Sequence, residues 1–184
     1  MKTRMLCIIL ILVLTVLVIV GSCAWTKFVQ EPGGASPTLL IGQIMIYVTK
    51  CPQPASLDGT HKKDITIQLE DQLTAKIIEL KSKGIDGYFS IINPENYHYK
   101  IVGFRLHEKT DRGTRELAFS FNGNIIIDSG KVNNVGIIEC DVNFKSTKVD
   151  IRINQKYEDI KIWFAKKYPD SAWNKKEWIN VGIF

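Results

Sequence analysis

The sequence has little of what metal sites and most catalytic sites are built from. It holds four cysteines and three histidines in 184 residues, and no histidine stands at ligand spacing from another histidine or from a cysteine. Zinc sites need several such ligands close together in the chain. A glycine-rich phosphate loop and the nucleophile-elbow motif are also missing. We therefore expect no metal, no cofactor and no catalytic residue, and we interpret the histidines as surface residues.

Basic residues are not gathered into a patch. The chain carries 24 basic and 19 acidic side chains, and two of the basic ones, Lys2 and Arg4, stand at its start without an acid beside them. Elsewhere the two signs are interspersed. Proteins that bind nucleic acids present a clustered basic face, so we expect no nucleic-acid partner.

The start of the chain has the three parts of a secretory signal. Lys2 and Arg4 are followed by an apolar run over residues 5–20, and small side chains then precede Cys23. This order of charge, apolar run and small residues is typical of a signal peptide. The apolar run is slightly short for a membrane span, which takes about 20 residues. We predict a signal peptide over residues 1–22.

The segment Val20-Gly21-Ser22-Cys23 resembles the lipobox of bacterial lipoproteins. The resemblance implies that the Cys23 thiol receives a diacylglyceryl group and that the leader is cut just before it. The protein would then be held by its N-terminal lipid on the bacterial cell membrane or outer membrane, facing the periplasm or the exterior. The alternative is an uncleaved anchor, in which residues 21–25 extend the apolar run. Either form exports the rest of the chain.

Residues 23–37 are predicted to form a flexible tether. Proline, glycine and serine dominate the segment from Glu31 to Pro37, and this composition favours a linker over a packed element. A single domain is expected over residues 38–184, which is long enough to bury a core without metals or many disulfides.

Two cysteines follow the predicted attachment site, Cys51 and Cys140. Disulfides are permitted outside the cytoplasm, and a Cys51–Cys140 bridge would close a long loop, which is worth roughly 4 kcal/mol. The other interpretation is two unpaired thiols, with Cys140 buried on a strand. The sequence leaves both open.

From Leu39 onward, short runs of alternating apolar and polar residues are separated by turn residues. Strands are predicted over residues 39–48, 65–69, 88–92, 97–102, 116–121, 124–128, 135–144 and 148–153, with 76–80 either a strand or a helical turn. Gly42, inside the first strand, suggests a bulge or a close approach of backbones. Short strands with regular turns favour a mainly β protein with an antiparallel β-sandwich.

Near the C-terminus the pattern changes to helical spacing. Aromatic and apolar residues recur over 155–168 as on one face of an amphipathic helix, and we expect this face to pack on a sheet. Asp170 or Ser171 is expected to cap a last short turn. Trp173 and Trp178 lie outside the helical stripe, so they are the candidates for an exposed surface that binds an envelope protein or a glycan.

A motif in the middle of the chain carries a second resemblance. Its parts are Asp86-Gly87-Tyr88-Phe89-Ser90-Ile91, the turn Asn93-Pro94-Glu95-Asn96, the segment Tyr97-His98-Tyr99-Lys100-Ile101 and the pair Gly103-Phe104. This order resembles the carboxypeptidase regulatory-like, or transthyretin-like, β-sandwich, an architecture shared with Ig-like domains. The chain departs from it at Asn96, where glycine is usual but asparagine tolerates the same left-handed backbone, and in the long loop over 52–63. The resemblance implies a binding or structural module without catalytic residues.

These observations predict a cell-envelope lipoprotein whose sandwich is a non-catalytic binding or scaffolding module. Two alternatives remain open. One is an envelope enzyme or enzyme inhibitor whose site is assembled from distant residues. The other is a structural subunit of an envelope complex. A fold does not carry a function by itself.

Overall fold

A computed structural model describes residues 29–49, 59–62, 64–83, 85–110, 113–143, 145 and 148–184. The predicted signal peptide, Cys23 and Cys51 lie outside these ranges. Residues Glu31–Phe184 form one compact unit, which thus includes the last part of the predicted tether. Within the described ranges, no helix is both long enough and apolar enough to cross a membrane.

The described part of the chain is mainly β, as the sequence predicts. Its strands are β1 (Leu39–Thr49), β2 (Gly59–His61), β3 (Ile65–Asp71), β4 (Ile77–Lys81), β5 (Tyr88–Ile92), β6 (His98–Thr110), β7 (Gly113–Ile126), β8 (Val132–Asn143), β9 (Lys148–Asn154) and β10 (Trp178–Asn180). Its helices are α2 (Tyr157–Lys167) and the short 3-10 helix η3 (Ala172–Lys175).

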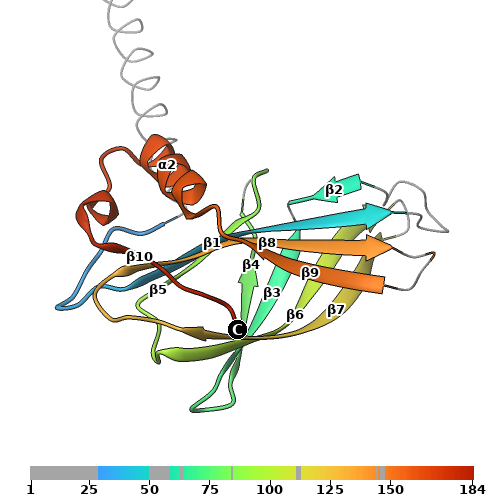
Figure 1. The fold of residues 1–184 in the computed structure, drawn as a ribbon, viewed down its shortest axis with the longest axis horizontal. Coiled ribbons are helices and arrows are strands. Elements are labelled where there is room, and N and C mark those ends of the chain that lie inside the picture. The colour runs from blue at the N-terminus through green and yellow to red at the C-terminus, as the bar shows by residue number, and fades with distance from the viewer. Residues whose placement is uncertain are drawn as a thin grey trace, which may run out of the picture. The chain divides into compact units, whose positions relative to one another are not determined.

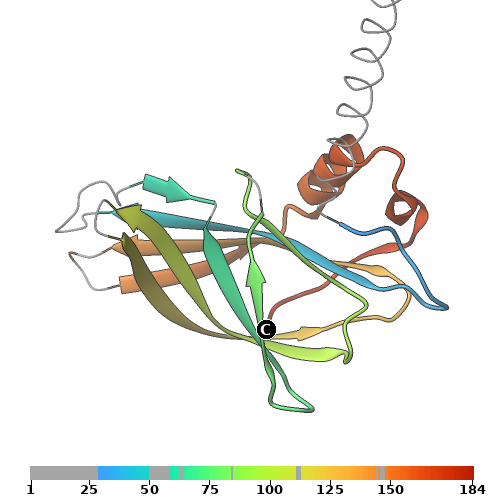
Figure 2. The same cartoon turned by 180° about the vertical axis from the view of Figure 1, so that it is seen from behind.

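The strands form two sheets that lie face to face (Figure 1; Figure 2). Sheet A runs in the order β10-β8-β1-β2, with β5 paired to β1 and β9 paired to β8, and sheet B runs β4-β3-β6-β7. Sheet B is antiparallel throughout. In sheet A, β8 pairs in parallel with both β1 and β10, so this sheet is mixed where the sequence predicted antiparallel pairing. Alternation of apolar residues indicates which face a strand buries, but not its partner or direction.

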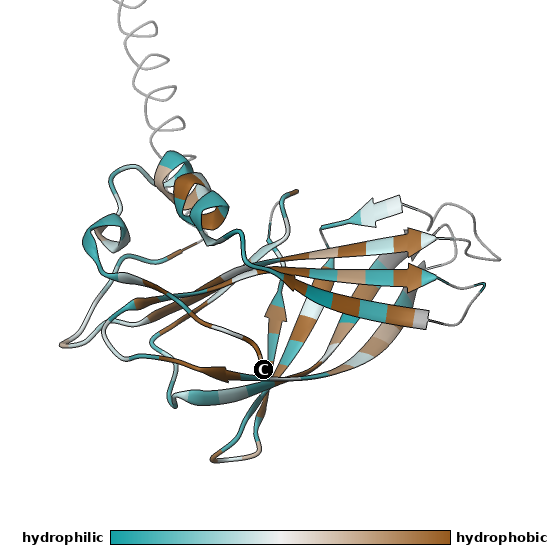
Figure 3. Cartoon of the chain, in the orientation of Figure 1, coloured by the Kyte–Doolittle hydropathy of each residue, from teal (hydrophilic) through white to brown (hydrophobic). Residues whose placement is uncertain are grey.

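The core lies between the two sheets. Alternate residues of β1, β3, β6 and β8 point into it and are fully or almost fully buried, among them Ile44, Ile67, Phe104 and Ile138. Figure 3 shows apolar and polar residues alternating along β9 and the last part of β8. Each such side chain contributes roughly 1.5–3 kcal/mol through its removal from water.

Gly42 sits at a bulge, as its place inside a strand predicts. The register between β1 and β8 shifts between Ile41 and Gln43. A Cβ atom at Gly42 would overlap the side chains of Val135 and Phe89. The position therefore needs glycine because the inner faces of β5 and β8 approach it too closely for any side chain.

Helix α2 packs against β8 and lies on the face of sheet A that is turned away from sheet B (Figure 1). Ile160 and Phe164 are buried, and the Trp163 ring stacks on Tyr88 of β5 with ring centroids 3.4 Å apart. Burial raises the pKa of the Tyr88 hydroxyl, and the nearby carboxylates of Asp86 and Asp159 raise it further. The predicted packing of the aromatic stripe on a sheet is confirmed.

Several predicted boundaries differ from the observed ones. The two strands predicted over 116–121 and 124–128 are one strand, β7, because Gly123 stays in the ladder opposite Ile101 beyond a register shift. Residues 76–80 correspond to a strand, β4. The sequence did not predict β2 and β10, which have three residues each. In the turn before β6, the left-handed residue is Asn93, with φ of 48°, and not Asn96.

Candidate binding pocket on the outer face of sheet B

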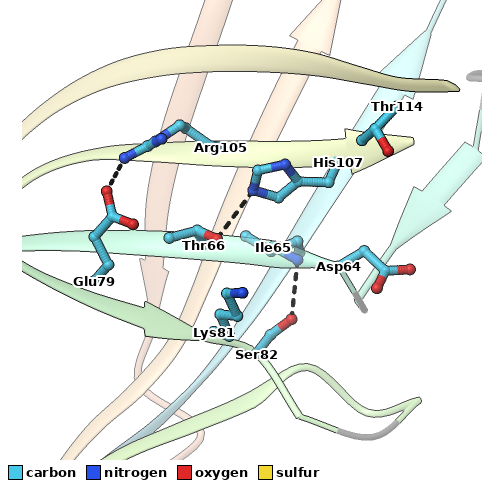
Figure 4. Close-up of a pocket in the computed structure, with 9 residues that line it drawn as sticks. All are labelled: Asp64, Ile65, Thr66, Glu79, Lys81, Ser82, Arg105, His107 and Thr114. Atoms are coloured by element: carbon cyan, nitrogen blue, oxygen red, sulfur yellow. Dashed lines mark hydrogen bonds and ion pairs between the residues drawn. The ribbon is translucent and has the colours of Figure 1, made fainter. Parts of the chain in front are cut away.

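The outer face of sheet B carries the polar half of the alternating pattern. On β3, Ile65 and Ile67 face the core while Thr66 faces away from it. A pocket of about 330 Å³ lies on this outer face and is lined by Asp64, Ile65, Thr66, Glu79, Lys81, Ser82, Arg105, His107 and Thr114 (Figure 4). The lining comes from β3, β4, β6 and β7 and the segments beside them, so the sheet itself positions these side chains.

Arg105 is fixed by carboxylates from the two sides. Its guanidinium forms an ion pair with Glu79 of β4, and a second one with Glu116 of β7, where Arg105 Nη1 lies 3.8 Å from Glu116 Oε1. The Arg105 Nε atom is buried and has no hydrogen-bond partner among the described residues. An unpaired buried donor is costly, but this N–H is closed to solvent, so a ligand does not reach it in this conformation.

The imidazole ring of His107 lies between a hydroxyl and a carboxylate. Its Nε2 atom lies 3.0 Å from Thr66 Oγ1, and its Nδ1 atom lies 3.5 Å from Glu116 Oε2. The order hydroxyl, imidazole, carboxylate matches the roles in a catalytic triad. However, Thr66 is only 2% exposed, so a substrate cannot approach its hydroxyl without rearrangement. In this conformation the contacts fix the imidazole ring above β3.

Three other lining groups remain unengaged. The Lys81 amino group, the Asp64 carboxylate and the Thr114 hydroxyl form no hydrogen bond or ion pair with the part of the chain that the structure describes. Ser82, by contrast, accepts a hydrogen bond from the Ile65 backbone N–H at 3.1 Å. The pocket thus combines a fixed polar floor with a cation, an anion and a hydroxyl that are available to a ligand.

Of the cysteines predicted as site residues, the structure describes Cys140, and it does not line the pocket. Cys140 is on β8, fully buried between the sheets, and its thiol has no disulfide partner among the described residues. Burial raises the pKa of this thiol to about 12, and Asp141 contributes to the rise. The interpretation of Cys140 as buried on a strand is confirmed. The Cys51–Cys140 bridge and the lipid at Cys23 stay predictions, since Cys51 and Cys23 lie outside the described residues.

Trp173 does not form an exposed surface. Its side chain is 0% exposed, which corrects the expectation of exposure. Ser171 caps η3 as predicted, because its Oγ atom accepts a hydrogen bond from the Trp173 N–H, and Glu31 binds Ser171 Oγ and the Ala172 N–H. These contacts hold the turn so that the indole lies inside the protein.

Trp178 is half-buried and engaged by its neighbours. Its indole Nε1 donates a hydrogen bond to the Trp173 carbonyl at 3.1 Å, and its ring lies 5.4 Å from Phe164. Trp173 and Trp178 are therefore close together, but they are apart from the pocket on sheet B. A binding role for this pair stays a prediction, and the burial of Trp173 leaves it without an open face.

Sequence reasoning did not find the pocket. Its residues come from four strands and the segments beside them, and most of them are ordinary outward-facing polar residues. The available signal was the mixture of both charge signs and His107 on the polar faces. The described residues hold no cluster of three or more histidine, cysteine, aspartate or glutamate side chains that could bind a metal ion.

Comparisons with known proteins add little. No family model and no curated protein matches the sequence. A leucine-rich repeat protein of known structure from Bacteroides thetaiotaomicron is similar over 73% of this chain and 16% of its own, with 10% sequence identity and a TM-score of 0.36. The chain thus spans a small part of that protein's length. At this TM-score the likeness carries no argument about fold or function.

Proposed function

We propose that this chain is a bacterial cell-envelope lipoprotein, anchored through Cys23, whose β-domain is a binding module that holds a small polar ligand in the pocket on sheet B. The observation that carries the binding role is the pocket itself. It combines an ion-paired arginine with Lys81 and Asp64, which have no partner among the described residues. Pockets of about this volume lie at the lower end of the range for small-molecule sites.

The anchor is proposed from the sequence. The charged start, the apolar run and the small residues before Cys23 support it. Two or three acyl chains together hold a protein firmly on a membrane, whereas one holds it marginally. The proposed partners are the membrane, through the lipid, and an envelope protein or glycan.

We also propose the carboxypeptidase regulatory-like type of sandwich. One feature supports it: Tyr99, Ile101 and Phe104 of the motif enter the core. This fold type favours a module over an enzyme, but function must be argued from the site.

Export of the domain can be tested with a reporter. We would fuse alkaline phosphatase, which is active only outside the cytoplasm, after Phe184 and express the fusion in a Gram-negative host. The matched control lacks residues 1–23. The proposal predicts an active enzyme from the full chain and an inactive one from the control. Equal inactivity of both fusions, at equal protein levels, would place the domain in the cytoplasm and overturn the proposal.

One contact favours a second candidate, an envelope hydrolase. The chain Thr66–His107–Glu116 has the order of a nucleophile, a base and an orienting acid. This candidate predicts turnover of an activated ester such as p-nitrophenyl acetate that disappears in Thr66→Val and in His107→Gln. A rate in the wild type no higher than in both variants would reject it.

A further inference from the structure

We infer that the pocket on sheet B recognises a compact zwitterion, a molecule that carries an anionic oxo group and an ammonium group a few bonds apart. A free amino acid and a phosphoethanolamine group share this chemistry. The inference rests on the proposed binding role of the same pocket and names the class of ligand.

The first step is to separate the groups that the fold already uses. Both terminal nitrogens of Arg105 face carboxylates, Glu79 on one side and Glu116 on the other. His107 is held between Thr66 and Glu116. These contacts make the floor of the pocket rigid, and a rigid floor lowers the entropic cost of binding.

The second step concerns the groups left for a ligand. Lys81 is a donor without an acceptor among the described residues, and Asp64 is an acceptor without a donor. Figure 4 shows Asp64 and Arg105 at opposite ends of the pocket, with Lys81 on the β4 side. An oxo anion would lie against Lys81, and an ammonium group would lie against Asp64.

The third step is charge balance. The lining contains two acidic side chains, Asp64 and Glu79, and two permanently basic ones, Lys81 and Arg105. A simple anion would be attracted by Lys81 but repelled by Asp64, and a simple cation would meet the reverse. Opposite charges within one ligand satisfy both free groups, so complementarity favours a zwitterion over either ion alone.

The fourth step is size. The volume of about 330 Å³ is enough for an amino acid or a dipeptide, and too small for a folded partner to enter. Donors and acceptors that converge on a small volume fix the orientation of a ligand. The pocket therefore suits a small zwitterion, or the charged end of a larger one.

The test uses ligand-observed saturation-transfer NMR on the detergent-solubilised full chain. Four probes are compared: L-alanine, phosphoethanolamine, propionate and ethylammonium. Propionate is alanine without its ammonium group, and ethylammonium is alanine without its carboxylate. The inference predicts that at least one zwitterion binds about fivefold or more tighter than both single ions. Whichever of the two zwitterions binds more tightly shows whether the preferred oxo anion is a carboxylate or a phosphate.

Variants test whether the probes bind in the pocket on sheet B. Lys81→Met and Asp64→Asn each remove one free charge and should weaken zwitterion binding about fivefold. Lys76→Met, in the exposed β3–β4 turn, and Asp150→Asn, exposed on β9, are the matched controls and should leave it unchanged. If propionate binds as tightly as the zwitterions, the pocket is a plain anion site. That result overturns the zwitterion class but leaves the proposed binding module standing. If no probe binds, or if neither pocket variant weakens binding, the inference is overturned. The export test of the proposed function does not depend on this result.

Discussion

Asp71 is a carboxylate at the end of β3 that organises the turn to β4. It is 1% exposed, and it accepts hydrogen bonds from the backbone N–H groups of Leu73 and Thr74 and from the Asn96 side chain. The Asn96 hydrogen bond is the largest cause that holds the pKa of Asp71 below its usual value. Such a group stabilises the fold fully above the pKa of the unfolded chain, and the contribution is lost as the pH falls through the lowered folded pKa.

We therefore predict that Asp71→Asn lowers the urea midpoint most near pH 7. Its difference from the wild type should shrink as the pH drops below about 4, where carboxyl groups of the unfolded chain become protonated. Urea unfolding followed by circular dichroism at several pH values measures this, with the exposed Asp150→Asn as the control. A difference that stays constant down to the acid limit would contradict the assignment.

Gly42 and Gly182 offer a matched pair of glycine substitutions. A Cβ atom at Gly42 would overlap Val135 and Phe89, whereas nothing lies within 4 Å of one at Gly182. Overpacking of a core costs about 1–3 kcal/mol, so Gly42→Ala should lower the free energy of unfolding by about 2 kcal/mol. Gly182→Ala should stay within about 0.5 kcal/mol. If the denaturant curves of the two variants coincide, Val135 and Phe89 do not exclude a Cβ atom at Gly42, and this explanation of the glycine is wrong.

Helix α2 is anchored to sheet A by one buried face. Phe164 is 0% exposed, whereas Ile162 is 62% exposed on the opposite side of the helix. Truncation of a buried phenylalanine typically costs about 3–5 kcal/mol, so Phe164→Ala should destabilise the whole domain by that amount, and Ile162→Ala hardly at all. Thermal unfolding measures both. If Phe164→Ala loses helical signal in a separate early transition, then α2 is an appendage and not part of the cooperative unit.

At the scale of elements, much could be predicted from local patterns. The period-two alternation located β3 and β6, apolar runs between turn residues located β1, β5 and β8, and the helical spacing located α2. Local patterns did not indicate that β8 runs parallel to β1, because pairing depends on residues far apart in the chain. They also failed at Gly123, where glycine signals a turn but the observed chain continues as β7 with a register shift.

At the scale of the molecule, the candidate site was beyond sequence reasoning. Arg105 and His107 are separated from Glu79 and Lys81 by an intervening strand, and only the order of sheet B brings them to one pocket. For Trp173 the sequence predicted a site that the structure does not have. Its position outside the helical stripe indicated exposure, but the capped turn at Ser171 buries it. Both outcomes depend on tertiary contacts that residue type alone does not specify.

The whole-molecule claim is a lipid-anchored module, and the intact mass of the membrane-extracted protein tests it most directly. We would compare the wild type with Cys23→Ser and, as a matched control within the same leader, Cys7→Ser. The account predicts a mature wild-type chain that begins at Cys23 with added acyl mass, unchanged in Cys7→Ser and lost in Cys23→Ser. A full-length, unlipidated wild type with no dependence on Cys23 would contradict it.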